Sequence, residues 1–231
     1  MRVYNYTKAK YALETLRTGH IKISTVANLN DPFELLALTF ETREERKVQR
    51  QIKAYMDEHL GLLCLSESGA EPVMWSHYGD CHRGIAFAFD IDEATPHFHK
   101  IRYSENRIPH RLQFEDRMPD MTTILDEVLY PTLTTKSVSW AYEREWRKIV
   151  LDHDWIMKRI SQPSDPKAVY AAFYEFSRDM RLAEVILGPD CKTTRSEAEQ
   201  ALSDGRLSAK VIKTRRAFKT FSIVPDQSKN P

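Results

Sequence analysis

The sequence has little glycine, few cysteines and no long apolar run, and each shortage excludes a class of protein. Only 7 glycines occur in 231 residues. A Gly-rich phosphate-binding loop, a dinucleotide-binding glycine fingerprint and a nucleophile elbow are all missing. Cys64, Cys81 and Cys191 are too few and too widely spaced to form a disulfide framework. The sequence therefore predicts reduced thiols and argues against the common phosphate-binding folds.

The chain also lacks an excess of charge and a segment long enough to cross a membrane. Its 34 Lys and Arg residues against 33 Asp and Glu residues leave a formal charge of +1. The protein as a whole therefore has no general attraction for nucleic acid or membranes. The first residues, Met1 to Tyr4, do not begin an apolar signal core. We expect a cytoplasmic protein with no membrane partner.

Composition and length predict one folded domain. A hydrophobic content of 42% with 29% charged residues is that of an ordinary globular protein. No internal repeat, low-complexity block or interdomain linker is visible. We predict a single mixed domain of helices and strands over residues 1–224 and a polar tail over residues 225–231.

Hydrophobic periodicity and turn residues predict alternating strands and helices. Thr7 is expected to cap the first helix, Gly19 to end it, and Pro131 to bound a later one. The expected strands cover residues 3–6, 21–23, 62–65, 84–90, 100–103, 144–151, 184–187, 209–212 and 218–224. The expected helices cover residues 8–18, 41–59, 73–78, 121–130, 167–178 and 196–202.

The strongest chemical signal is the segment Glu143 to Arg147 at the start of a predicted strand. Alternate strand residues share a face, so Glu143, Glu145 and Arg147 would meet the same environment. Buried carboxylates are costly unless they are paired, and two of them in one place suit a site that stabilises a cationic centre. The alternative is a solvated strand edge with alternating charges.

Two further segments combine groups that bind ligands with groups that form turns. Asn30-Asp31-Pro32-Phe33-Glu34 either positions a ligand or makes a structural turn. Trp75, Ser76, His77 and Tyr78 suit stacking on a planar ligand, or else Trp75 and Tyr78 seal the core from a helical turn.

Histidines and cations elsewhere give weaker signals. His77, Cys81 and His82 lack the spacing of a zinc motif, and we predict no metal site. The basic run from Lys210 to Lys219, interleaved with Phe218 and Phe221, is suited to contacting phosphates, although a solvated hairpin is the commoner use of such a run.

Four short motifs carry a resemblance when they are taken in order. They are Tyr4-Asn5-Tyr6-Thr7, Asn30-Asp31-Pro32-Phe33-Glu34, Trp75 through Gly79, and Glu143 through Arg147. Together they resemble a widespread bacterial domain family of unknown function with the pattern Tyr-x-Tyr-Thr, Asn-Asp-Pro-Phe-Glu, Trp-x-x-Tyr-Gly and Glu-x-Glu-Trp-Arg. That pattern is in turn similar to the ADP-ribosyltransferase superfamily. The resemblance implies an α+β fold with a mixed, largely antiparallel split β-sheet and flanking helices.

The resemblance also implies a site built around NAD as substrate. Glu145 matches the catalytic glutamate, Glu143 the glutamate that orients the acceptor, and Tyr78 the aromatic residue beside nicotinamide. Asn5 is a departure, because it stands where the superfamily has His or Arg. The other NAD-binding residues that the resemblance implies are Tyr4, Tyr6, Thr7, Asn30, Asp31, Glu34, Trp75, Ser76 and Arg147.

The expected function is therefore that of an NAD-dependent ADP-ribosyltransferase-like enzyme, which releases nicotinamide and transfers ADP-ribose to a protein or nucleic-acid acceptor. Such an enzyme is typical of a bacterial toxin or phage-defence effector with an antitoxin or defence partner. The carboxylate of Glu145 would stabilise the positive charge left on the ribose.

Two alternatives keep the same fold. One is a nucleotide or nucleic-acid binding module without turnover, in which Trp75 and Tyr78 stack on bases and the run from Lys210 to Lys219 meets phosphates. The other is an NAD-dependent RNA 2′-phosphotransferase with Arg83 and Arg147 near the acceptor phosphate.

Overall fold

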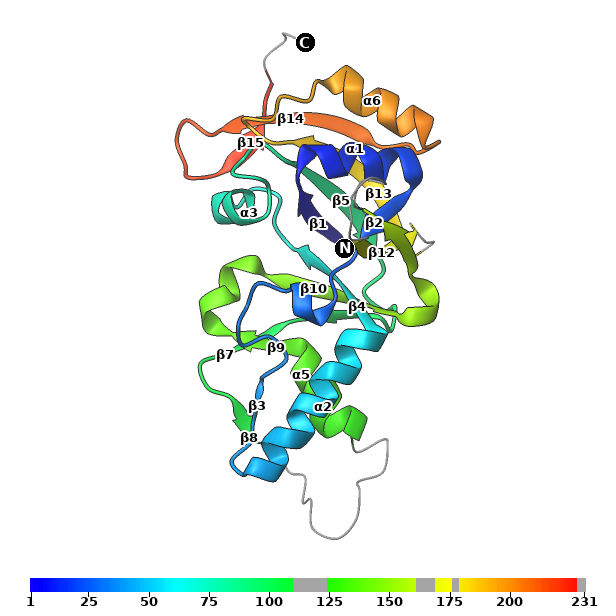
Figure 1. The fold of residues 1–231 in the computed structure, drawn as a ribbon. Coiled ribbons are helices and arrows are strands. Elements are labelled where there is room, and N and C mark those ends of the chain that lie inside the picture. Colours follow the sequence, from blue (N-terminus) through cyan, green and yellow to red (C-terminus); the bar gives the residue numbers. More distant parts are fainter. Residues whose placement is uncertain (110–123, 161–168, 176–178, 228–231) are drawn as a thin grey trace.

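The computed structural model describes residues 1–109, 124–160, 169–175 and 179–227, and these form a mixed α and β structure (Figure 1). The helices are α1 (Ala9–Thr18), α2 (Arg43–His59), α3 (Pro72–His77), α5 (Tyr130–Thr134) and α6 (Arg195–Asp204), with shorter helical turns η1 (Val26–Asn28), η2 (Leu125–Leu129), η3 (Val138–Glu143) and η4 (Asp152–Asp154). In this part of the chain no helix is long and apolar enough to cross a membrane.

Most of the strands belong to one large sheet, in the order β15-β14-β13-β5-β1-β4-β10-β6. They are β1 (Arg2–Thr7), β4 (Leu60–Ser66), β5 (Ile85–Ile91), β6 (Phe98–Lys100), β10 (Glu145–Leu151), β13 (Met180–Leu187), β14 (Lys210–Arg216) and β15 (Ile223–Pro225). Neighbours run antiparallel except β13 and β14, which are parallel. The predicted mixed, largely antiparallel sheet of an α+β protein is confirmed.

Smaller sheets flank the large one. One has the order β11-β12-β2, and two strand pairs are β3 with β8 and β7 with β9. Their bounds are β2 (His20–Lys22), β3 (Leu38–Thr39), β7 (Arg102–Ser104), β8 (Ile108–Pro109), β9 (Thr135–Ser137), β11 (Ile156–Arg159) and β12 (Tyr170–Glu175).

The large sheet opens between β1 and β4, and this opening positions the site. β1 pairs with β5 along its whole length, from Arg2 to Thr7, but with β4 only at Tyr4 and Ser66. In Figure 1 the two parts of the sheet lie one above the other, with β1 in the upper part and β4 and β10 in the lower. A space therefore remains between β1 and β4 where ladder hydrogen bonds would otherwise hold them together.

The upper part of the sheet is covered on both faces because its strands alternate large and small residues. Phe87 and Phe89 of β5 pack in the same cluster as Leu16 of α1 and Leu202 of α6. The intervening alanines of β5 face the other side, where Trp75 of α3 packs. Successive strand side chains point to opposite faces of the sheet. The phenylalanines of β5 therefore pack against α1 and α6 on one face, and its alanines leave room for Trp75 on the other.

The lower part of the sheet is covered by α2 and α5 (Figure 1). α2 begins with a capping box, in which the Thr42 hydroxyl accepts from the Glu45 N–H and the Glu45 carboxylate accepts from the Thr42 N–H. Met56 at its far end packs with Leu62 of β4 and Leu133 of α5. This packing holds β4, which borders the opening, in place from the side of α2 and α5.

Several predicted elements differ from the structure. Residues 170–175 of the predicted helix 167–178 form strand β12, which pairs with β2 and β11, and Val169 before it is not helical. Residues 167, 168 and 176–178 of that helix lie outside the described residues. Lys8, not Thr7, is the N-cap of α1, without a side-chain cap bond. The helical run continues past Pro131, which occupies the first turn of α5, where its missing N–H is tolerated.

Three other segments have bounds that differ from those predicted. The last strand begins at Ile223 and not at Phe218. The predicted strand 100–103 is divided at Ile101 into the ends of β6 and β7. Of the predicted helix 121–130, residues 121–123 lie outside the described part, as do residues 228–231 of the predicted tail.

Candidate functional site

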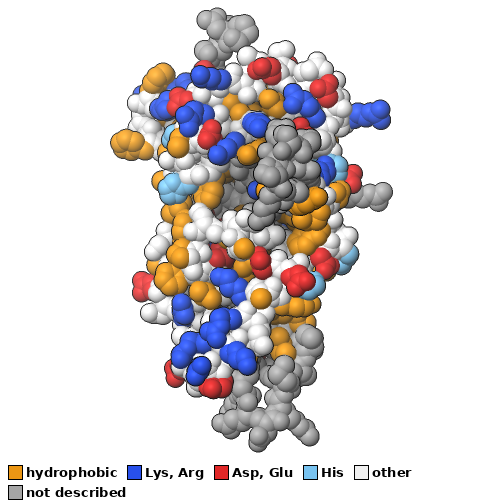
Figure 2. Space-filling view, viewed as in Figure 1, with side chains coloured by type: hydrophobic (Ala, Val, Ile, Leu, Met, Phe, Trp, Pro, Cys, Tyr) orange, Lys and Arg blue, Asp and Glu red, His pale blue; other side chains and the backbone are white. Residues whose placement is uncertain are grey.

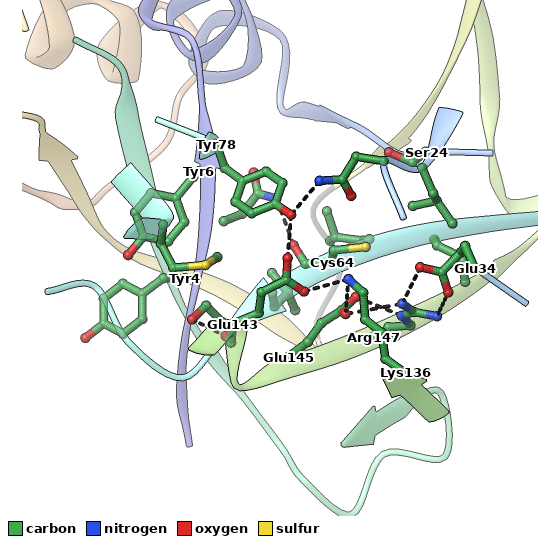
Figure 3. Close-up of a pocket in the computed structure, with 18 of the residues that line it drawn as sticks. Tyr4, Tyr6, Ser24, Glu34, Cys64, Tyr78, Lys136, Glu143, Glu145 and Arg147 are labelled. Atoms are coloured by element: carbon green, nitrogen blue, oxygen red, sulfur yellow. Dashed lines mark hydrogen bonds and ion pairs between the residues drawn. The ribbon is translucent and has the colours of Figure 1, made fainter. Parts of the chain in front are cut away.

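A cavity of about 240 Å³ lies in the opening between β1 and β4 (Figure 3). β1 contributes Tyr4, Asn5 and Tyr6, and β4 contributes its residues from Leu62 to Ser66. The loops after β2 and α3, together with β9 and the η3–β10 junction, complete the wall. Segments far apart in the sequence therefore meet at one place.

A chain of alternating charges runs along the floor of this cavity (Figure 3). The Arg147 guanidinium donates to both carboxylate oxygens of Glu34, at 2.7 and 3.0 Å, and to both oxygens of Glu145, at 2.7 and 3.2 Å. The Lys136 ammonium lies 2.6 Å from Glu143 and 3.3 Å from Glu145. Glu143 accepts a further hydrogen bond from the Tyr78 hydroxyl.

These charges are buried and do not form a solvated strand edge. Glu143 and Glu145 are each 3% exposed and Arg147 is 1% exposed. The alternative of an ordinary charged surface is therefore wrong. Buried charges persist in proteins when they are paired and hydrogen-bonded, and each member of this chain meets that condition.

The backbone at Arg144 brings the two glutamates to the same cavity. Glu143 ends η3 and Glu145 begins β10, so simple strand alternation does not relate them. Arg144 between them adopts the left-handed conformation, with φ 45° and ψ 52°, and its N–H caps η3. A non-glycine residue in this region stores strain of about 1–3 kcal/mol, and such strain is concentrated at functional sites.

The surroundings separate the proton affinities of the two glutamates. Burial alone would raise the pKa of Glu145, but the charges of Arg147 and Lys136 outweigh it and hold that pKa at about 2. For Glu143 burial dominates, only partly offset by Lys136, and its pKa is raised above the ordinary value. Glu145 is thus a fixed anion, whereas Glu143 takes up a proton more readily.

Neutral groups complete the polar wall. The Asn30 amide donates to the Tyr78 hydroxyl at 2.8 Å, and that hydroxyl in turn donates to Glu143. Burial first, and then the Glu143 carboxylate, raise the pKa of Tyr78, which keeps it a hydrogen-bond donor. The Asn5 amide donates to the Cys64 carbonyl at 3.1 Å across the opening. Its side-chain oxygen has no hydrogen-bond partner among the described residues and can accept from another group.

Most of the residues predicted for the site line this cavity, but some do not. Those that do are Tyr4, Asn5, Tyr6, Asn30, Glu34, Tyr78, Glu143, Glu145 and Arg147. Thr7 ends β1 away from the cavity, and Ser76 is exposed on α3. Asp31 is buried and accepts from the Phe33 N–H at 2.9 Å, so its carboxylate makes a structural turn.

Trp75 also has a structural place. It is fully buried, its indole N–H donates to the Gly69 carbonyl at 2.9 Å, and the Tyr6 ring meets it edge-on at 5.0 Å. A side chain at Gly79 would collide with the Trp75 ring and backbone, which explains the glycine of that motif. Trp75 therefore offers no ring face to a ligand, and Tyr78 is the residue of the motif that reaches the cavity.

Sequence reasoning missed Lys136. This lysine lies on the short strand β9, its side chain is only 4% exposed, and it bridges the two glutamates. Burial would lower the pKa of Lys136, but Glu145 and Glu143 raise it, so the ammonium stays charged. Two buried carboxylates so close in the sequence imply that a second cation is needed beside Arg147. The sequence therefore indicates that a second cation is present but does not show which residue supplies it.

Cys64 is a second residue that sequence reasoning missed. It lines the cavity beside Glu145, and burial together with that carboxylate raises the pKa of its thiol. The thiol is therefore not an activated nucleophile. Within the described ranges, no group of three or more His, Cys, Asp or Glu side chains is placed to hold a metal ion.

Comparison with known proteins gives one match. A family described as "Protein of unknown function (DUF2971)" matches residues 74–148. This segment runs from α3 into β10 and contains Tyr78, Lys136, Glu143, Glu145 and Arg147, but neither β1 nor the loop at residues 30–34. No curated protein and no solved structure matches the chain.

Proposed function

We propose that the protein is an NAD-dependent ADP-ribosyltransferase-like enzyme that acts in the cavity between β1 and β4. The observation that carries this proposal is the convergence of β1, the loop at residues 30–34, Tyr78 and the η3–β10 junction on one cavity. These are the segments on which the resemblance rests. The opening of the sheet at the same place is consistent with a split-sheet fold.

The charges of the cavity suit the chemistry of nicotinamide release. When the bond between ribose C1′ and the nicotinamide nitrogen breaks, its electron pair leaves with nicotinamide and positive charge develops on the ribose. The acceptor then bonds to C1′ and loses a proton. The buried carboxylates of Glu34, Glu143 and Glu145 outnumber the buried cations Lys136 and Arg147. The third cation of the lining, Lys22, is exposed on β2, so the buried floor is anionic when its groups are ionised. A preorganised anionic site stabilises such a transition state.

The two glutamates have different surroundings, and we assign them different roles. Each oxygen of Glu145 already accepts from Arg147, and one accepts from Lys136 as well. Among the described residues, each oxygen of Glu143 has a single donor, Tyr78 on one and Lys136 on the other. Because a carboxylate oxygen accepts two hydrogen bonds, Glu143 has more capacity for a substrate hydroxyl. In this proposal Glu143 faces the ribose and Glu145 positions Lys136 and Arg147. This assignment differs from the one that the resemblance implies, in which Glu145 is the catalytic glutamate and Glu143 orients the acceptor.

The size of the cavity limits which part of NAD it encloses. Pockets that enclose a whole drug-sized ligand usually measure roughly 300–1,000 Å³. At about 240 Å³ this cavity is smaller, so it would hold the nicotinamide ribose and leave the adenosine outside. Asn5 would accept from a ribose hydroxyl through its unused side-chain oxygen.

The resemblance also supports a wider biological proposal. An enzyme of this kind would be a cytoplasmic effector of the toxin or phage-defence type, and its acceptor would be a protein or a nucleic acid. A partner that restrains it, such as an antitoxin, would belong to the same system.

The experiment is an assay of nicotinamide release from NAD by the purified protein, with cell extract as the source of acceptor. Glu143→Gln keeps the size of the side chain and removes its charge, and we expect it to lower the rate by about 100-fold or more. Glu14→Gln, at an exposed position on α1, is the matched control and should behave like the parent. A parent protein that neither binds NAD nor releases nicotinamide would refute the proposal, as would full activity of Glu143→Gln.

A further inference from the structure

The turn between β14 and β15, residues 217–222, exposes two phenyl rings. Phe218 is 88% exposed and Phe221 is 103% exposed, whereas no other large apolar side chain of the described residues exceeds the 60% of Tyr55. Figure 1 shows this hairpin projecting from the body of the protein, and Figure 2 shows hydrophobic side chains protruding at the same corner beside Lys and Arg side chains. Single exposed apolar residues are ordinary, but two aromatic rings exposed on one short turn indicate a contact surface.

The turn is held in place by hydrogen bonds. The Ala217 N–H donates to the Ser222 carbonyl at 2.9 Å, and the Thr220 and Ser222 hydroxyls lie 2.7 Å apart. The next residue, Ile223, donates its N–H to the Ala70 carbonyl at 2.9 Å and is buried. The two rings are therefore presented on a structured support, which lowers the entropy lost when a partner binds.

The charge around the rings is positive. Residues 209–225 contain no acidic residue, and three of their cations, Arg215, Arg216 and Lys219, lie in or next to the turn. Lys210 begins β14 at its far end, and Lys213 donates to the Gly188 and Cys191 carbonyls. The Arg215 guanidinium lies over the Phe218 ring, 4.3 Å from its centroid. Asp226 pairs with Arg215 and Asp190 pairs with Arg216, so three cations near the turn meet two acids. The hairpin thus combines flat aromatic faces with positive charge.

We propose that this hairpin binds single-stranded nucleic acid. Bases would stack on Phe218 and Phe221, and phosphates would meet Lys219 and Arg215. Sequence-tolerant single-strand binding uses this pairing, since every base has a flat face and every nucleotide a phosphate. A membrane anchor would bury the tip of the loop, but here the polar pair Lys219 and Thr220 separates the two rings.

The hairpin is continuous with the wall of the cavity. Ile223 at its base packs in the same cluster as Tyr6 and Met74, which both line the cavity, and the Tyr78 ring packs against this cluster. A strand bound at the hairpin tip would therefore extend along the α3 side of the protein. Binding at the hairpin needs no NAD, so this inference does not depend on the proposed enzymatic activity.

The test is fluorescence anisotropy of a short labelled oligo(dT) and a short labelled oligo(rU), without NAD and at rising salt. We expect the parent to bind both at low salt and the double variant Phe218→Ala/Phe221→Ala to bind at least about tenfold more weakly. Phe218→Leu/Phe221→Leu keeps apolar surface but removes the flat faces, and it should also lose binding. Lys219→Ala should make the logarithmic salt dependence shallower by about 0.7.

Tyr55→Ala, which removes an exposed ring from α2, is the matched control and should bind like the parent. Far-UV circular dichroism should show that every variant is folded, because the altered side chains have few contacts to lose. No oligonucleotide binding by the parent at low salt would overturn the inference, and so would equal binding by the parent and both double variants. Binding of the parent and the leucine variant to phosphatidylserine vesicles, without binding to oligonucleotides, would assign the hairpin to a membrane instead.

Discussion

Replacing Lys136 by Met tests whether the buried charges in the cavity depend on one another. Lys136 is the only cation that contacts Glu143 among the described residues, with its ammonium 2.6 Å from the carboxylate. Met keeps much of the side-chain volume but leaves Glu143 as a buried anion without a counter-charge. Removing one partner of a buried ion pair typically costs about 3–5 kcal/mol. For a chain of this size, each kcal/mol lowers the melting temperature by roughly 2–4 °C, so we expect a fall of about 6–20 °C at neutral pH.

The loss of stability caused by Lys136→Met should become smaller as the pH falls. Burial already raises the pKa of Glu143, and removal of Lys136 raises it further. A carboxyl group whose folded pKa is raised destabilises the fold at pH values above its unfolded pKa, and the penalty fades as the pH falls through the folded pKa. The destabilisation by Lys136→Met should therefore be large at pH 8 and smaller at pH 5, because Glu143 takes up a proton more readily as the pH falls.

Urea unfolding of four proteins at both pH values measures this effect. The four are the parent, Lys136→Met, Glu143→Gln and the double variant Lys136→Met/Glu143→Gln. The double variant should recover most of the lost stability, because no buried anion is left without its cation at Glu143. An equal loss at pH 8 and pH 5, or a double variant no more stable than Lys136→Met, would refute this account of the charge chain.

Three other predictions concern the same cavity. Arg147→Met should lower the free energy of unfolding in urea by about 3–5 kcal/mol, because Glu34 and Glu145 lose their shared cation. Adding Glu34→Gln and Glu145→Gln should restore much of this stability, and no recovery would contradict the pairing. Glu145→Gln should have a lower free energy of unfolding in urea than the parent at pH 7. The difference between the two proteins should narrow only as the pH falls below about 4.5 toward 2, because the pKa of Glu145 is held at about 2 in the fold. Tyr78→Phe should lower stability by about 1 kcal/mol in thermal denaturation, since Glu143 and Asn30 lose a hydrogen-bond partner, whereas an unchanged melt would mean that the bond is weak.

The sequence predicted the charged face of β10 because the pattern there is local. Alternation placed Glu145 and Arg147 on one face and Trp146 on the other, and the structure has this arrangement. The need to pair buried carboxylates also followed from elementary electrostatics. Lys136 was missed because its role depends on a strand brought alongside by tertiary structure, and a single lysine in a short polar run has no periodic signal.

Residues 170–175 show how pairing partners override local preference. Ala171 and Ala172 favour a helix when they are considered alone, so the local pattern predicts a helix there. In the structure this segment lies between β2 and β11, and Ala172 is buried in the main core cluster. Strand formation there depends on neighbours more than ten residues away, which a local pattern does not contain.

The motif around Trp75 contains residues that pack in the core and a residue that lines the cavity, and the sequence alone does not distinguish them. Trp75 and Gly79 fit each other in the core, whereas Tyr78, one residue before the glycine, reaches the cavity. A similar division holds at residues 30–34, where Asp31 makes the turn and Asn30 and Glu34 face the site. In both motifs, residues that line the cavity and residues that stabilise the fold lie within a few positions of each other, and only their packing distinguishes them.

The most direct test of the central claim is a crystal structure of Glu143→Gln soaked with NAD, since this variant should bind the dinucleotide without cleaving it. We predict that the nicotinamide ribose lies in the cavity between β1 and β4, with ribose hydroxyls within hydrogen-bonding distance of residue 143 and Asn5. NAD bound outside this cavity, or a cavity that stays empty at millimolar NAD, would contradict the proposed function.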